Sequence, residues 1–139
     1  MPGIDVVDST WFAAKPSAVA ALVADPANWR RWWPGLELAV DEWRNEKGVR
    51  WTVTSVDGNR GSGLLGTAEV WLEPMFEGVV AHFFLRLDSA PGHRLRRSEA
   101  ARVERRFRQR TKRVFWTMAD QMDPGRLTRH TSTSHASVT

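Results

Sequence analysis

The sequence predicts an α+β fold in which a curved antiparallel sheet wraps around one long C-terminal helix. Residues 36–88 alternate between apolar and polar side chains over short connections, which indicates strands with one covered face. Residues 98–123 carry an apolar stripe at helical spacing. No helix separates these strands, which favours an antiparallel sheet over a doubly wound parallel one. A length of 139 residues fits a single domain with its own core.

The N-terminal part predicts one strand and two short helices. Residues 5–13 mix β-branched and aromatic side chains with rough alternation, which favours a strand. Pro16 suits the first position of a helix, because the N–H it lacks has no partner there. Asp25-Pro26 ends this helix, since a residue before proline avoids the α region. A second short helix over 27–33 ends at Pro34-Gly35.

Four further strands are predicted in succession, each bounded by turn-forming residues. They span 36–43, 49–54, 64–73 and 79–88. The residues at 57–61 have strong turn chemistry, which predicts a loop there.

The final helix has two different faces. Its apolar stripe holds Ala100, Val103, Phe107, Thr111, Val114, Met118 and Met122. Its basic face holds Arg102, Arg105, Arg106, Lys112 and Arg113. Pro124-Gly125 ends the helix, so we predict one domain over 1–125. Residues 126–139 are rich in Ser, Thr and His, and we expect a disordered tail there.

The composition excludes several classes of site. The chain has no cysteine, which rules out disulfides, thiolate metal sites and a cysteine nucleophile. No metal-ligand spacing or cofactor motif occurs, so we expect neither a metal nor a cofactor. No signal-like segment and no apolar run of roughly 20 residues is present. We therefore expect a soluble, cytoplasmic protein.

Charge is distributed unevenly along the chain. Residues 1–93 hold 8 Lys and Arg against 12 Asp and Glu, whereas residues 94–113 hold 10 against 2. An anionic membrane or an acidic partner would therefore meet the C-terminal helix first. A solvated helix face would look the same in sequence.

Four segments resemble the START-like superfamily, specifically the bacterial polyketide cyclase/dehydrase and lipid-transport family. They are DPANW at 25–29, WWPGL at 32–36, GTAEVWLEP at 66–74 and GVVAHFFLR at 78–86. The resemblance implies the helix-grip fold, with an apolar ligand held between the sheet and the long helix. Many members have six strands after the short helices, whereas this sequence predicts four. We therefore expect a smaller or more open cavity.

The expected ligand-binding residues lie on the inner faces of the strands and on the helix. They are Trp51, Val53, Ala68, Val70, Ala81, Phe83, Leu85, Phe107, Arg110, Thr111, Val114 and Met118. A groove lined in this way suits a lipid, a fatty-acyl chain or a polyketide-like molecule. The same side chains would also serve as an ordinary core.

Arg110 is the charged residue that falls near the apolar stripe of the helix. A buried arginine needs a partner. The sequence leaves three: a carboxylate such as Glu69, the polar head of a ligand, or solvent reached by extending to the rim.

The tryptophans have two interpretations. Trp29, Trp32 and Trp33 beside two arginines could form a lid or a membrane contact, but inward packing of at least two of them is favoured. Trp116 lies within the basic face of the helix, where a cation–π contact or a partner interface would explain it.

The sequence holds little that indicates catalysis. His82 and Glu69 could form an acid–base pair on neighbouring strands, although a surface contact is the commoner outcome. The sequence therefore favours binding without chemical conversion, and no catalytic residue is assigned. A polyketide cyclase or aromatase remains the alternative. Nucleic acid is disfavoured as a partner, because no recognition motif accompanies the basic helix.

Overall fold

The helices and strands follow the alternation and turn signals of the sequence to within two residues at each end. A computed structural model describes residues 3–55, 63–92 and 94–123. In these ranges it contains β1 Ile4–Phe12, α1 Pro16–Ala24, α2 Pro26–Trp32, β2 Leu36–Trp43, a 3-10 turn η1 Asn45–Lys47, β3 Gly48–Ser55, β4 Leu64–Met75, β5 Gly78–Ser89 and α3 Arg97–Met122. The predicted loop at 57–61 and the predicted tail at 126–139 lie outside the described residues.

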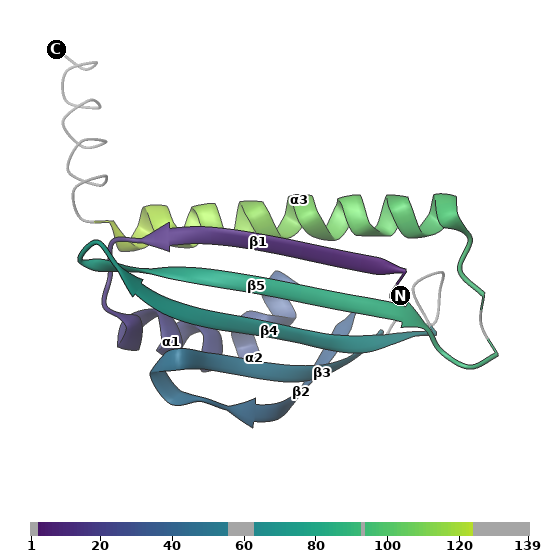
Figure 1. Ribbon diagram of the computed structural model, residues 1–139, viewed down its shortest axis with the longest axis horizontal. Helices are drawn as coiled ribbons and strands as arrows, with labels where there is room; N and C mark the ends of the chain where they lie inside the picture. The colour runs from purple at the N-terminus through teal and green to yellow at the C-terminus, as the bar shows by residue number, and fades with distance from the viewer. Residues whose placement is uncertain (1–2, 56–62, 93, 124–139) are drawn as a thin grey trace, which may run out of the picture.

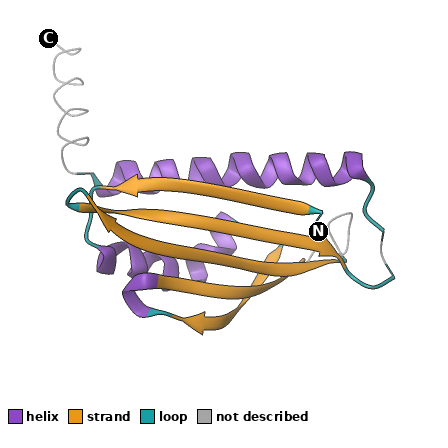
Figure 2. Cartoon of the chain, in the orientation of Figure 1, coloured by secondary structure: helices purple, strands orange, loops and turns teal. Residues whose placement is uncertain are grey.

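The five strands form one antiparallel sheet in the order β1-β5-β4-β3-β2. Three hairpins connect β2 to β5 in sequence order, and β1 then pairs with β5, which places Ile4 opposite Leu87. The expected α+β architecture is confirmed, with a curved open sheet, one long C-terminal helix and short helices after the first strand (Figures 1 and 2).

The strands bury one face each. Positions 79, 81, 83, 85 and 87 of β5 are all buried, as the alternation predicts. In β2 the burial of every second residue ends after Leu38, and Val40 lies half-exposed although it still pairs with Trp51. The pairing register with β3 then shifts between Val40 and Glu42, which makes a bulge in this edge strand.

Asp25 divides the two short helices. It is the C-cap of α1 and the N-cap of α2, and its Oδ1 accepts a hydrogen bond from the backbone N–H of Ala27 at 3.0 Å. Pro26 then starts α2 in the position that suits proline. Both helices lie behind the sheet in Figure 1, against its inner face.

The long helix α3 runs beside β1 at the edge of the sheet (Figure 1). The ring of Phe115 contacts that of Phe12, with centroids 6.2 Å apart. Glu104 accepts the backbone N–H of Asp5 at 2.8 Å. The buried stripe of α3 is therefore Thr111, Phe115 and Met118, turned from the predicted stripe, which omitted Phe115.

Candidate functional site

The predicted ligand-binding residues of the sheet lie together on its inner face. All seven are buried: Trp51, Val53, Ala68, Val70, Ala81, Phe83 and Leu85. Register pairs Trp51 with Ala68 and Ala68 with Leu85, so the set forms one continuous surface across β3, β4 and β5. The alternation of these strands places them there, because every second side chain of a strand faces the same way.

The predicted residues of α3 divide into two groups. Thr111 and Met118 are buried, whereas Phe107 and Val114 remain half-buried at the margin of the core. Helix and sheet residues therefore border the same interior. The half-buried pair leaves apolar surface on α3 within reach of solvent.

Tryptophans of α2 and of the segment after it fill the space between these two walls. The indole of Trp33 stacks on Phe83 with centroids 5.0 Å apart, and its Nε1 donates to Thr111 Oγ1 at 3.3 Å. Trp29 lies edge-on to Trp51 at 5.2 Å. Trp32 is also buried, so inward packing holds for all three indoles. Trp51 and Val53 have no solvent-accessible area, so neither side chain borders a cavity large enough to hold water.

The Trp51 indole carries a buried donor that finds no acceptor in the described part of the chain. Its Nε1 makes no hydrogen bond, whereas the Nε1 of Trp29 donates to the Val23 carbonyl at 2.5 Å. Trp29 and Trp33 lie edge-on to the Trp51 ring, and an aromatic ring is a much weaker acceptor than a carbonyl. Leaving a buried donor unpaired costs about 1–3 kcal/mol. No pattern in the sequence distinguishes this indole from the others.

Arg110 binds backbone carbonyls at the end of α2. Its guanidinium donates to the Trp32 carbonyl, and at 3.0 Å to the Arg31 carbonyl. The last carbonyls of a helix lack partners within the helix and carry partial negative charge, so a cation is favoured there. Glu69, the carboxylate considered from sequence, binds Arg44 instead.

The outer face of the sheet holds a second group of polar residues. His82 Nδ1 lies 2.8 Å from Ser9 Oγ, and His82 Nε2 lies 3.4 Å from Glu73 Oε1. The His82 ring also stacks on Trp71 at 5.1 Å. The carboxylate next to His82 is therefore that of Glu73 and not that of Glu69, which pairs in register with Phe84.

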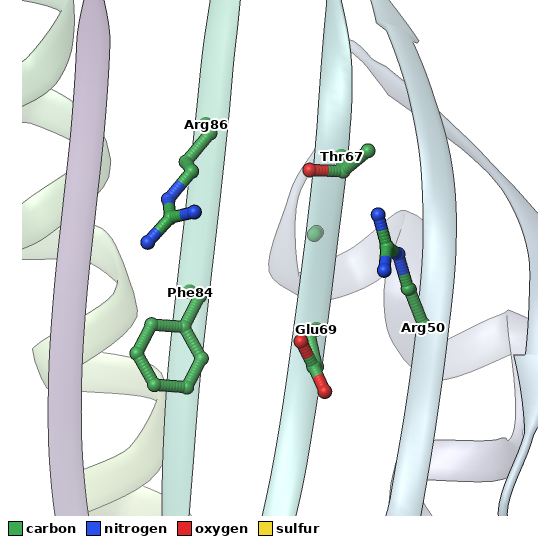
Figure 3. Close-up of a pocket in the computed structure, with 6 residues that line it drawn as sticks. Arg50, Thr67, Glu69, Phe84 and Arg86 are labelled. Atoms are coloured by element: carbon green, nitrogen blue, oxygen red, sulfur yellow. The ribbon is translucent and has the colours of Figure 1, made fainter. Parts of the chain in front are cut away.

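A shallow hollow of about 200 Å³ lies on this same outer face. Figure 3 shows Arg86 and Arg50 on the strands that flank β4, with Thr67 and Glu69 between them. The lining charges have partners: Arg50 lies 3.6 Å from Asp41 and Arg86 lies 3.7 Å from Asp5. Ligand pockets are usually larger, at roughly 300–1,000 Å³. We therefore assign no ligand to this hollow.

Arg44 ties the hollow to the β2–β3 hairpin. It holds the pKa of Glu42 below its ordinary value by a hydrogen bond and by charge attraction. The two carboxylates Glu42 and Glu69 in turn raise the pKa of Arg44. In the described residues, no group of three or more His, Cys, Asp or Glu side chains is arranged to hold a metal ion.

Comparison with solved structures identifies the architecture. Aha1 from Colwellia psychrerythraea, solved as a dimer, matches 88% of this chain and 98% of its own, with TM-score 0.56 and 11% identity. MLL2253 from Mesorhizobium loti matches 86% of this chain and 98% of its own, with TM-score 0.59 and 13% identity. CalU16 from Micromonospora echinospora matches 95% and 84%, with TM-score 0.56 and 10% identity.

The chain has the helix-grip fold. The expected resemblance to START-like and polyketide cyclase-like proteins is thus confirmed at the level of the fold. No family model matches the sequence, and no curated protein matches it significantly. Identities this low carry no residue roles across, so the function must be argued from the site itself.

No helix in the described ranges is long and apolar enough to cross a bilayer.

Proposed function

We propose that the protein binds a small molecule with an apolar body and a hydrogen-bond acceptor, in the space that Trp33 occupies between the sheet and α3. A lipid, a fatty acid or a polyketide-like aromatic acid has this chemistry. The observation that carries the proposal is the unpaired Nε1 of Trp51 inside an apolar wall. A carbonyl or carboxylate of the ligand would accept this hydrogen bond, and its apolar body would replace the Trp33 indole against Phe83.

The position of Trp33 makes it the side chain that a ligand can displace. It follows α2, a helix of only seven residues, and precedes Pro34 and Gly35. Gly35 has φ +92°, and a Cβ placed there would meet no atom within 4 Å, so the space on that side of Gly35 is open. Helices this short have little stability of their own. The contacts of Trp29, Trp33 and Arg110 with the rest of the protein therefore hold α2 in place.

The polyketide cyclase alternative needs polar groups that meet around one substrate. Arg110 lies on the inner side of the sheet, between α3 and α2. His82 and Glu69 lie on the outer face. These three residues do not converge, so we propose no reaction for them.

Trp33→Ala should bind oleic acid and 2-naphthoic acid at least about fivefold more tightly than the wild type. In the wild type the ligand must first displace the indole, and removing that step raises the apparent affinity. Isothermal titration calorimetry and native mass spectrometry measure the effect. Because Trp33→Ala removes a core side chain, Trp33→Leu is the variant to use if the first does not fold.

Trp43→Ala is the matched control, since Trp43 is a half-exposed tryptophan on the edge strand β2. It should bind both acids as the wild type does. Absence of binding to both acids by the wild type and by Trp33→Ala would falsify the proposal. Equal affinity of the wild type and Trp33→Ala would place the ligand elsewhere and overturn the assigned site.

Trp51→Phe tests the hydrogen bond itself, with Trp29→Phe as its counterpart. Both changes shrink a buried indole, but only Trp29 loses a hydrogen bond that exists without ligand. In urea unfolding, Trp51→Phe should therefore cost about 1–2 kcal/mol less than Trp29→Phe. It should also weaken binding of both acids about tenfold. Equal destabilisation by the two changes, with unchanged affinity, contradicts the role of Trp51.

A further inference from the structure

The turn between β4 and β5 places a bulky aromatic side chain where the backbone disfavours it. Phe76 and Glu77 both have positive φ, 52° and 61°, and they join Met75 to Gly78 as a two-residue hairpin loop. This pattern is that of a type I′ turn, which strongly prefers Asn-Gly. The Phe76 side chain is nevertheless 83% exposed. Neither turn geometry nor burial accounts for a phenylalanine here, and strain of this kind concentrates at functional positions.

Further apolar side chains surround this turn. The Nε1 of Trp11 donates to the Met75 carbonyl at 2.9 Å. A Cβ at Gly78 would lie 2.8 Å from the Trp11 ring, so the indole covers the base of the turn. Trp11 and Met75 are both exposed.

The C-terminal part of α3 reaches the same end of the molecule. Phe115 contacts Phe12, and Phe12 pairs in register with Val79 of β5, next to the turn. The neighbouring Trp116 is 61% exposed. In Figure 1 the β4–β5 turn, the end of β1 and the end of α3 all lie at the left. We call Trp11, Met75, Phe76 and Trp116 the aromatic end.

Unpaired arginines lead along α3 to the aromatic end. Arg102, Arg105, Arg106 and Arg113 are exposed and have no ion pair or hydrogen bond among the described residues. Lys112 is different, since it pairs with Asp8 and lies 5.6 Å from the centre of the Trp116 ring. The cation–π contact expected for Trp116 therefore comes from a lysine. An aromatic end continued by free arginines combines an apolar anchor with positive charge.

We propose that this end of the molecule docks on an anionic lipid bilayer, with Phe76 and Trp116 in the interface and the arginines of α3 on the headgroups. Phe76 protrudes from a hairpin tip, and a fluid bilayer accommodates such a projection without a shaped pocket. Tryptophan favours the boundary between apolar chains and water. Arginines near an anionic surface add attraction that salt screens. Glu77 lies at the same end, and its negative charge opposes docking on an anionic surface.

Co-sedimentation tests the proposal with vesicles of phosphatidylcholine, with and without phosphatidylserine. The wild-type protein should sediment with the vesicles that contain phosphatidylserine and not with those of phosphatidylcholine alone. Added salt should release the bound protein. Replacing Arg105, Arg106 and Arg113 together by Gln should weaken partitioning about fivefold for each arginine. Phe76→Asn should weaken it about tenfold, whereas Glu77→Gln should strengthen it.

Two control variants match these changes elsewhere on the surface. Trp43→Ala removes an exposed tryptophan of β2, and Arg50→Gln removes a partly exposed arginine of β3, on the two strands at the other side of the sheet from β1. Both should sediment as the wild type does. Equal sedimentation with neutral and anionic vesicles overturns the proposal. No sedimentation with either kind of vesicle also overturns it, and an acidic protein is then the partner left for this surface. Phe76, Arg105, Arg106 and Arg113 are exposed and lie outside the interior site, so their effect on sedimentation separates docking on the surface from binding of a lipid inside the protein.

Discussion

Single residues fix the position of α2, and Arg110 is the one whose role changes most between sequence and structure. As a charge near an apolar stripe it suggested a ligand contact, but its guanidinium is bound to two carbonyls of α2. The contact joins the last turn of α2 to the middle of α3. Arg110 therefore holds in place the segment that carries Trp33.

Arg110→Ala should lower the free energy of unfolding by about 1–2 kcal/mol, because two carbonyls at the end of α2 lose a charged donor. Arg106→Ala, on the exposed face of the same helix, should change it by less than about 0.5 kcal/mol. Urea unfolding followed by circular dichroism compares them. A similar value for both variants would mean that water replaces the guanidinium at no cost.

At the scale of elements, the sequence predicts the buried face of the strands well, and it predicts the buried face of α3 less well. Alternation places the seven sheet residues on one buried face, because every second side chain of a strand faces the same way. A shift of the pairing by one residue would turn these side chains to the solvent face. The face of a long helix is harder to assign, because half-buried side chains flank the contact. The predicted stripe omits Phe115 because α3 lies beside β1, which rotates the contact stripe from the one expected for a helix that crosses the sheet.

The packing within the predicted site could not be read from sequence at all. The inner-face residues were identified, but alternation says nothing about what stands in front of them. Trp33 follows the short helix α2 and precedes Pro34, and nothing in this local sequence indicates that its indole stacks on Phe83. The missing partner of Trp51 is likewise a property of three-dimensional surroundings.

The β4–β5 turn allows a prediction at this same scale, for stability alone. Phe76→Asn should raise the free energy of unfolding by about 1 kcal/mol, because asparagine tolerates the left-handed conformation that costs other residues about 1–2 kcal/mol. Phe76→Ala keeps that cost and should bring no gain. Thermal and urea unfolding measure both variants. A loss of stability in Phe76→Asn would show that the aromatic ring itself supports the turn.

At the scale of the whole molecule, an ion pair between Asp8 and Lys112 joins the sheet to the long helix. Asp8 of β1 is 7% exposed, and its carboxylate is paired with Lys112 and accepts the hydroxyl of Thr10 at 2.9 Å. This pair fixes α3 against β1 midway along the helix. The basic helix and the acidic body are therefore connected by a specific contact in addition to apolar packing.

Lys112→Met should lower the free energy of unfolding by about 2–3 kcal/mol, because a buried carboxylate is left with one hydroxyl as its partner. Asp8→Asn combined with Lys112→Met should recover part of the loss, since no charge is then left unpaired. A double-mutant cycle in urea measures the coupling. Additive losses would show that the pair contributes nothing beyond its separate side chains.

Covering β1 has a consequence for association between copies of the chain. Glu104 takes the Asp5 N–H at that edge, so a second sheet can extend this one more readily at β2. There the register shift at Val40 and the carboxylates of Glu37, Asp41 and Glu42 oppose edge-to-edge pairing. The strand that contributes least to the core therefore carries the features that oppose extension of the sheet by a second copy of the chain.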